Sequence, residues 1–111
     1  MEIAFVNKEV RKSAESSRVA QRKYGAEVAN ALRTCMADIA AVDSILDLPT
    51  PATFSSESSR AFTIPLDGGA VVTFECTHIR ALPLIKGTDQ IDLSKVRRVM
   101  LMQIEVGNGT R

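Results

Sequence analysis

The sequence predicts an α+β domain with helices packed on one face of a mostly antiparallel sheet. Apolar residues recur every three or four positions between residues 25 and 43, which is typical of an amphipathic helix. Between residues 61 and 76 they recur at every second position, which is typical of paired strands. With 111 residues, of which 45% are apolar, the chain can bury one core, and we expect a single domain over residues 1–106.

The N-terminal region should form a short strand followed by two helices. Residues 1–6 contain Ile, Phe and Val and alternate weakly with polar residues, which favours a strand. Asn7 is a good helix N-cap, because its side-chain oxygen can accept a hydrogen bond from a backbone N–H of the first turn. Ser13, Ser16 and Ser17 lower the helix propensity, so we expect a break near residue 16.

A core-packing helix is predicted between residues 25 and 43, with one further turn as an extension. Its apolar positions are spaced alternately by four and three residues, which places them in one stripe along the helix. They are Val28, Leu32, Cys35, Ile39, Val42 and Leu46. Pro49 and Pro51 cannot continue the helix, and Asp43-Ser44 already favours a stop. The polar stretch from Thr50 to Ser59 then predicts a loop.

The period-two segment predicts a β-hairpin. Its first strand places Phe62, Ile64 and Leu66 on one face, and its return strand does the same with Val72, Phe74 and Cys76. Asp67-Gly68-Gly69 between them supplies the positive φ of a tight turn. Pro65 has no backbone N–H to donate, so it indicates the edge or the end of a strand.

A last strand is predicted after an irregular connection over residues 77–95. Val99 and Leu101 should lie on one of its faces, and Met100, Met102 and Ile104 on the other. Because both faces are apolar, we expect a central strand that is covered on both sides. Residues 107–111 are expected to form a disordered tail.

The net charge of +1 gives no indication of a nucleic-acid partner, but the charges are distributed unevenly. The first basic group, in the predicted N-terminal helices, comprises Lys8, Arg11, Lys12, Arg18, Arg22 and Lys23. The second, ahead of the last strand, comprises Lys86, Lys95, Arg97 and Arg98. Both are candidates for phosphate contacts, and solvated surface charge is the alternative for both. Residues 38–57 contain Asp38, Asp43, Asp47 and Glu57 and no base.

Several classes of protein do not fit the sequence. The two cysteines lack a CxxC or Cys/His spacing, so we expect free thiols in a reducing compartment, no metal site and no cofactor. The chain opens without the basic and apolar regions of a signal peptide. No apolar run approaches the ~18 residues of a membrane span. We therefore expect a cytoplasmic protein without a membrane partner.

Several short segments resemble, in their order and spacing, the HigB-type branch of the RelE-like toxin superfamily, the plasmid-maintenance killer proteins. They are Met1-Glu-Ile-Ala-Phe-Val-Asn-Lys8, Lys23-Tyr-Gly-Ala-Glu-Val28, Asp47-Leu-Pro49, the hairpin from Phe62 to Glu75, and Asp92-Leu-Ser-Lys-Val96. The resemblance implies a small cytosolic toxin with helices packed on a sheet. It also implies ribosome-dependent mRNA cleavage and an antitoxin encoded nearby, often a helix-turn-helix protein, that covers the toxin.

Cleavage of RNA without a metal requires activation of the 2′-hydroxyl, cations around the pentacoordinate phosphate and an acid for the 5′-oxygen. By the resemblance, the basic loop before the hairpin corresponds to residues 56–60, in which Arg60 is the one base. The family's hairpin arginine corresponds to Val71, and its terminal Tyr or His falls at Gly107-Asn108. The catalytic candidates are therefore Arg60, Lys86 and His78, the single histidine; for His78 a surface loop position is the alternative.

Three functions stay open on the sequence. The first is a ribosome-dependent mRNA endonuclease with an unusual, weakened site. The second is a catalytically inert relative that binds an antitoxin-like partner, the ribosome or RNA. The third is an unrelated small α+β binding module. A homodimer formed through the surface that a partner would cover is a further expectation.

Overall fold

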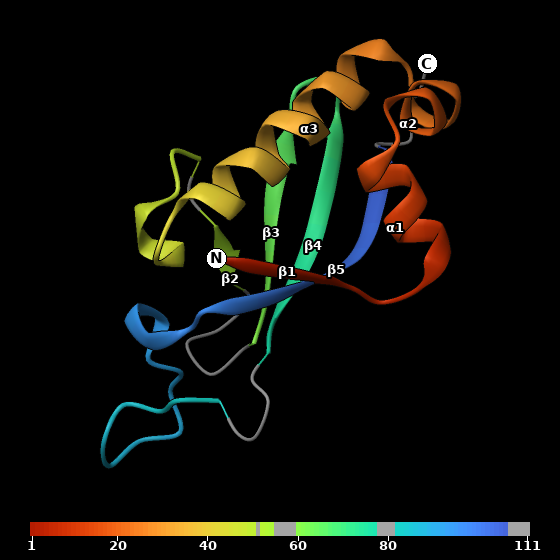
Figure 1. Ribbon diagram of the computed structural model, residues 1–111. Coiled ribbons are helices and arrows are strands. Elements are labelled where there is room, and N and C mark those ends of the chain that lie inside the picture. The colour runs from red at the N-terminus through yellow and green to blue at the C-terminus, as the bar shows by residue number, and fades with distance from the viewer. Residues whose placement is uncertain (51, 55–59, 78–81, 107–111) are drawn as a thin grey trace.

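Three helices lie over one face of a five-stranded sheet in the computed structural model, which describes residues 1–50, 52–54, 60–77 and 82–106 (Figure 1). The elements are β1 (Glu2–Phe5), α1 (Lys8–Glu15), α2 (Ser17–Tyr24), α3 (Ala26–Ala41), β2 (Thr53–Phe54), β3 (Ala61–Leu66), β4 (Ala70–Thr77) and β5 (Arg98–Val106), with 3-10 turns at Ile45–Asp47 and Leu93–Lys95. The predicted α+β class is confirmed. The predicted tail at 107–111 lies outside the described residues.

The strand order is β1-β5-β4-β3-β2, with β1 parallel to β5 and the other pairs antiparallel. The predicted hairpin is β3–β4, and β5 is central because it pairs with a strand on each side. The sequence did not reveal β2, which pairs only Thr53 with Thr63 and Phe54 with Phe62. The ring of Phe54 lies 5.2 Å from that of Phe62, so this short strand adds an aromatic contact at the sheet edge.

Pro65 lies in the part of β3 that extends past the end of β2, so no strand of the described chain pairs with it on the outer side. The N–H of Cys76 donates to the carbonyl of Arg60 at 2.8 Å, so hydrogen-bonded pairs recur at Phe62, Ile64 and Leu66 along β3. The backbone of Pro65 therefore points away from β4, toward the outer edge, where it offers no N–H. The edge position predicted for this proline is confirmed, and a further strand is disfavoured there.

The packing of α3 on the hairpin forms the centre of the core. Val28, Leu32, Cys35 and Ile39 are buried as predicted, within or beside a cluster that includes the stacked rings of Phe62 and Phe74, 5.4 Å apart. The extension of this stripe to Leu46 is wrong. The helix ends at Ala41, and Val42 has extended backbone, so Leu46 is 66% exposed while its neighbour Ile45 is buried.

A β-bulge in the β4–β5 pairing changes which residues of β5 face the core. Thr73 is opposite Gln103 but Phe74 is opposite Leu101, so Met102 is an extra residue on β5. The bulge places Ile104 opposite the buried Val72, on the core face with Val99 and Leu101. The predicted grouping of Ile104 with Met100 and Met102 is therefore wrong, because strict alternation does not continue across a bulge.

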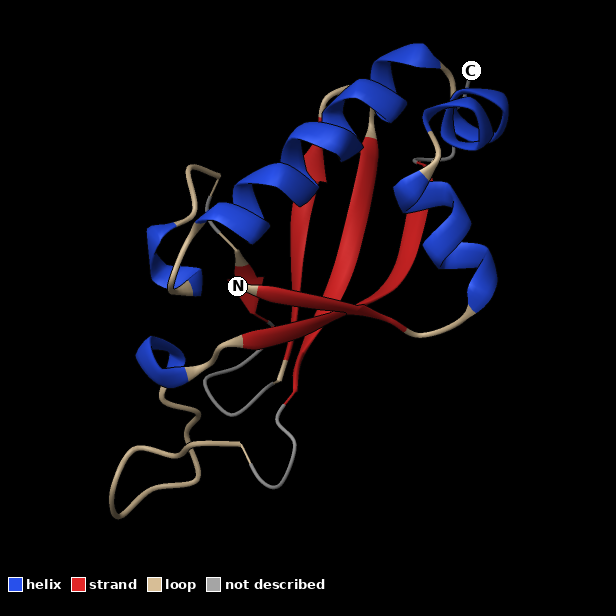
Figure 2. Cartoon of the chain, in the orientation of Figure 1, coloured by secondary structure: helices blue, strands red, loops and turns tan. Residues whose placement is uncertain are grey.

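The face of the sheet opposite the helices, called here the open face, is covered by no helix of the described chain (Figure 2). Met100 and Met102 of β5 are only partly buried, whereas Val99 and Leu101 are fully buried. The prediction that β5 is covered on both sides is therefore wrong. The helices gather on one face because each presents one apolar stripe, and all three stripes meet the same core.

Side-chain and terminal caps fix the ends of the helices. The Oδ1 of Asn7 accepts from the N–H of Val10 at 2.9 Å, which confirms the predicted N-cap of α1. Ser16 ends α1 and caps α2 by accepting from the N–H of Val19 at 3.3 Å, which confirms the predicted break. The ammonium group of Met1 donates to the carbonyls of Ala40 and Val42, at 3.0 and 2.8 Å, and so supplies a positive charge at the C-terminal end of α3.

Leu32→Ala should lower the free energy of unfolding by about 2–5 kcal/mol, since Leu32 is 1% exposed and its truncation leaves a cavity between α3 and the hairpin. Leu46→Ala removes the same atoms from an exposed site and should change stability by less than about 0.5 kcal/mol. Urea unfolding of both variants measures the difference. Equal losses would contradict the packing of α3 on the hairpin.

The hairpin turn offers a second test, because Gly68 and Gly69 both have positive φ, +93° and +85°. An alanine at either position should lose about 1–2 kcal/mol from the left-handed backbone alone. A Cβ at Gly68 would lie 2.7 Å from Cγ2 of Val28 on α3, whereas one at Gly69 would meet no atom within 4 Å. Urea unfolding should therefore show the larger loss for Gly68→Ala; equal losses would mean that the turn does not approach α3 this closely.

Candidate functional site

The open face presents few cations. Val72, Phe74 and Cys76 face the core, so the open face of β4 holds Val71, Thr73, Glu75 and Thr77. The strand pairing extends this face to Arg98 and Glu105 of β5 and to Glu2 of β1. Its charged residues, within the described segments, are three carboxylates and one guanidinium. That guanidinium, of Arg98, forms an ion pair with Glu2 at 3.6 Å.

Val71, the position to which the toxin resemblance assigns an arginine, pairs with Glu105 on one side and Pro65 on the other. The carboxylate of Glu105 accepts a hydrogen bond from Nε2 of Gln103 at 2.8 Å. These pairs contain no cation. A phosphate group at this part of the open face would meet the carboxylate of Glu105 and the amide of Gln103. Such a surface repels an RNA backbone.

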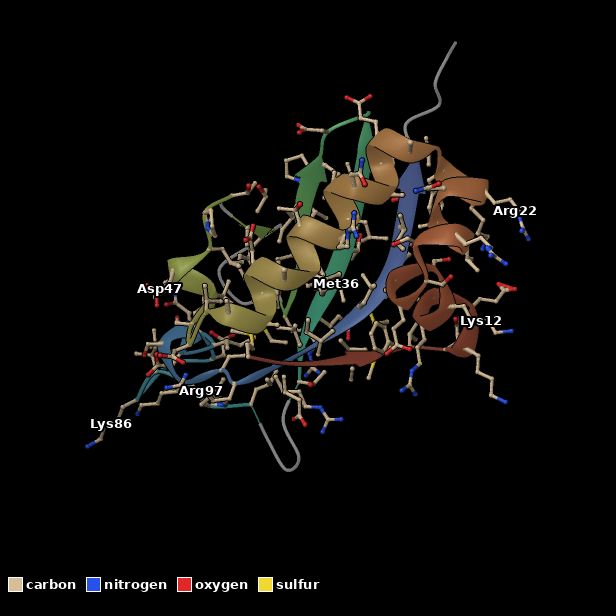
Figure 3. All side chains as sticks on the ribbon, turned by 45° about the horizontal axis from the view of Figure 1, so that its top comes forward. Lys12, Arg22, Met36, Asp47, Lys86 and Arg97 are labelled. Carbon is tan, nitrogen blue, oxygen red and sulfur yellow. The ribbon has the colours of Figure 1, made fainter. Side chains whose placement is uncertain are left out.

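The three catalytic candidates are not joined into one site. Arg60 is exposed and lies opposite Cys76, and the alternation from Phe62 places it on the core side of the sheet. Lys86 is exposed in a loop closed by the bridge between Leu84 and Ile91, and it points away from the body of the molecule (Figure 3). Within the described segments, no ion pair links either cation to a carboxylate that could orient it. His78 lies outside the described residues.

The two basic groups lie at opposite ends of the molecule. Figure 3 shows Lys12 and Arg22 on α1 and α2 at one end, and Lys86 and Arg97 at the other. All six cations of the first group are exposed: Lys8, Arg11, Lys12, Arg18, Arg22 and Lys23. Arg11 pairs with Glu15 at 3.1 Å, while Lys8, Lys12, Arg18 and Arg22 form no ion pair with any described residue. This α1–α2 surface is therefore available to an anionic partner.

The second basic group has protein partners instead. Lys95 pairs with Asp92 at 3.8 Å, and Arg98 pairs with Glu2. The Nη1 of Arg97 donates to the carbonyls of Ser94 and Val96, at 2.6 and 3.2 Å. These contacts favour a structural role for Lys95, Arg97 and Arg98, in which they hold the start of β5. They leave Lys86 as the cation of this group without an ion pair among the described residues.

A groove lies between α3 and the outer edge of β3, with a volume of about 340 Å³, and we call it the α3–β3 groove. Its apolar part includes Cys35 and Leu48 with Ile64 and Leu66 of β3. Among the residues that the structure describes, its charged lining consists of Glu27, Asp38 and Asp67, without a base. The excess of acidic residues from residue 38 onward was the one indication of this site in the sequence. The sequence gives no stronger indication because the three carboxylates come from separate parts of the chain.

Both cysteines are buried free thiols, as predicted. Burial raises the pKa of Cys35 from its ordinary 9.0 to about 11, and the negative charge of Asp38 adds to this. Burial likewise raises the pKa of Cys76 to about 11. The positive charge of Arg60 lowers this pKa by a smaller amount, and the negative charge of Glu75 raises it further. Neither thiol is a reactive nucleophile at neutral pH, since the thiolate is the reactive form.

These thiols predict a loss of stability at alkaline pH. The folded state binds the thiol protons more tightly than the unfolded chain, so the stabilisation is complete below pH 9 and is lost as the pH rises toward about 11. The urea midpoint should therefore fall between pH 9 and 11. In a Cys35→Ala/Cys76→Ala variant, less stable at pH 7, the fall should be smaller; an equally steep fall would assign it to other groups.

Among the residues that the structure describes, no three His, Cys, Asp or Glu side chains are grouped to hold a metal ion. In the same residues, no helix has the length and apolarity to cross a membrane. No family model matches the sequence, and no curated protein and no solved structure matches it either. The open face, the α1–α2 surface and the α3–β3 groove are therefore the features from which a function is inferred.

Proposed function

We propose that this chain is the toxin-like member of a toxin–antitoxin pair that acts by binding a protein partner, and that it has lost RNA cleavage. The observation that supports this most is the charge of the open face. Of the described residues, three carboxylates, Glu2, Glu75 and Glu105, lie there with one guanidinium, that of Arg98, which is paired with Glu2.

The transition state of RNA cleavage accumulates negative charge on the phosphate, which a catalyst must stabilise with cations or hydrogen-bond donors. Removing one such donor costs roughly two to three decades in rate. On this chain Val71 replaces the expected arginine, and Arg60 lies on the core side of the sheet. The carboxylates of the open face, Glu2, Glu75 and Glu105, repel a phosphate, so this face fits a protein better than an RNA.

A partner that covers the open face would remove apolar surface from water. Met100 of β5 is only partly buried there, opposite Glu75, and Thr73 and Thr77 lie on either side of Glu75 along the same face of β4. Methionine side chains adapt their shape to a contacting surface, which suits a binding face. The antitoxin-like protein implied by the resemblance is a partner of this kind.

A second candidate function, contact with RNA or the ribosome, is favoured by the α1–α2 surface. Lys8, Lys12, Arg18 and Arg22 are exposed and free of ion pairs with the described residues. Such a surface binds phosphate without regard to sequence, and its affinity falls as salt is raised. Binding of this kind needs no general acid or base, so this contact does not require RNA cleavage.

The proposal predicts no growth arrest when the chain is expressed alone, and a stable complex when it is expressed with the product of the neighbouring gene. Primer extension across cellular mRNA should show no new 5′ ends after induction. The complex should survive affinity purification and elute as one species on size exclusion.

Arg60→Ala and Val71→Glu variants serve as paired readouts. Ribosome-dependent cuts that disappear in Arg60→Ala would overturn the loss of cleavage and identify Arg60 as a catalytic cation. Val71→Glu adds a carboxylate to the open face and should weaken the complex while leaving the fold intact. A complex of unchanged affinity would show that the partner does not use this face.

A further inference from the structure

The α3–β3 groove has the shape and charge of a site for a basic polypeptide segment. Eleven residues of α3 separate Glu27 from Asp38, which corresponds to roughly 16 Å of helix. Eleven residues are also close to three full helical turns, so both carboxylates lie on the same face of α3 and line the groove. Asp67, in the hairpin turn, adds a third carboxylate to the lining.

These carboxylates form no ion pair within the described chain, and the guanidinium of Arg33 beside the groove donates to Oδ1 of the lining residue Asn30, at 3.2 Å. Glu27, Asp38 and Asp67 take part in none of the chain's described ion pairs, and the groove lining contains no lysine or arginine. The field of Asp38 reaches Cys35 in the groove, where it adds to the rise in the pKa of that thiol. A cationic occupant would therefore meet attraction from three sides and repulsion from none of the lining residues.

Between the carboxylates the groove lining is mixed, with Asn30 and Thr34 as polar residues on α3 and an apolar part contributed largely by the opposite side. Leu48, Ile64 and Leu66 are buried or half-buried, and they offer a surface to an aliphatic side chain. Pro65 presents no N–H along the outer edge of β3, so an occupant cannot continue the sheet past this point. Recognition must then come from side chains. An extended segment of about five residues covers the length between Glu27 and Asp38, at roughly 3.3 Å per residue.

We propose that the α3–β3 groove binds an extended segment of the partner polypeptide that carries Lys or Arg about four residues apart, so that both cations lie on one side of the segment, with aliphatic residues between them. The inference rests on the proposed function in naming a protein partner as the occupant. It adds where the partner is held and which side chains it must present. The groove lies on the helix side of β3 and adjoins the open face at Pro65, so a partner can engage both surfaces at once.

The test uses the complete chain and the peptide Lys-Ala-Leu-Ala-Lys-amide, labelled with fluorescein at its N-terminal amine. Fluorescence anisotropy should show saturable binding that a control peptide of reversed charge, Glu-Ala-Leu-Ala-Glu-amide with the same label, does not show. The triple variant E27Q/D38N/D67N should weaken the binding by roughly tenfold or more. The variant E9Q/D43N/D89N changes the net charge equally at exposed sites outside the groove and should bind like the unmodified chain.

Three results would overturn the proposal. The first is the absence of saturable binding, or an equal loss of binding in both triple variants, which would indicate attraction by net charge alone. The second is displacement of the peptide by micromolar spermine, together with a partner protein that does not bind in the groove. This result would make a free polyamine the occupant of the groove. The third is self-association that E27Q/D38N/D67N abolishes, which would assign the groove to the α1–α2 surface of a second copy.

The outcome is separable from that of the proposed function. If the neighbouring gene product binds the chain and its triple groove variant equally well, the groove inference fails while the binding function stands. If induction produces ribosome-dependent RNA cuts, the proposed loss of cleavage fails, and the peptide titration still decides what the groove binds. Thermal unfolding of both triple variants confirms that each remains folded.

Discussion

The packing of α3 on the β3–β4 hairpin is the interaction on which the rest of the structure depends. Leu32 and Ile39 lie against a core that contains Phe62 and Phe74, and the close approach of Gly68 to Val28 brings the turn up to the helix. Because this core uses one face of the sheet, the other face is left open. Because α3 packs over β3, the α3–β3 groove remains between the helix and the outer side of this strand.

Local patterns in the sequence predicted the elements whose causes are local. The three- and four-residue spacing predicted the buried stripe from Val28 to Ile39, and the serine at position 16 marked the break between α1 and α2. The β-bulge at Met102 was not visible, since an extra residue in a strand depends on the partner strand. The assignment of Leu46 to the buried stripe was wrong because α3 already ends at Ala41, whereas the hydrophobic spacing in the sequence continues to Leu46.

The candidate site was predicted less well, because its properties depend on pairs of distant residues. Counting bases identified two basic groups, but only the structure shows that Glu2 neutralises Arg98 and Asp92 pairs with Lys95. The first of these pairs joins two neighbouring strands, β1 and β5, that lie far apart in the sequence. The groove has the same property, since the side chains of α3 and the hairpin turn meet only in the folded state.

The place of β5 in the sheet has a consequence for how the chain is made. This strand lies between β1 and β4, and it pairs with both. A growing chain therefore holds β1 and the hairpin without their common neighbour until residues 98–106 leave the ribosome. Contacts between such distant segments form slowly, and the unpaired edges and apolar side chains are exposed meanwhile. The sheet is therefore completed only after β5 has been made, and a chaperone or a bound partner would protect the incomplete sheet in that interval.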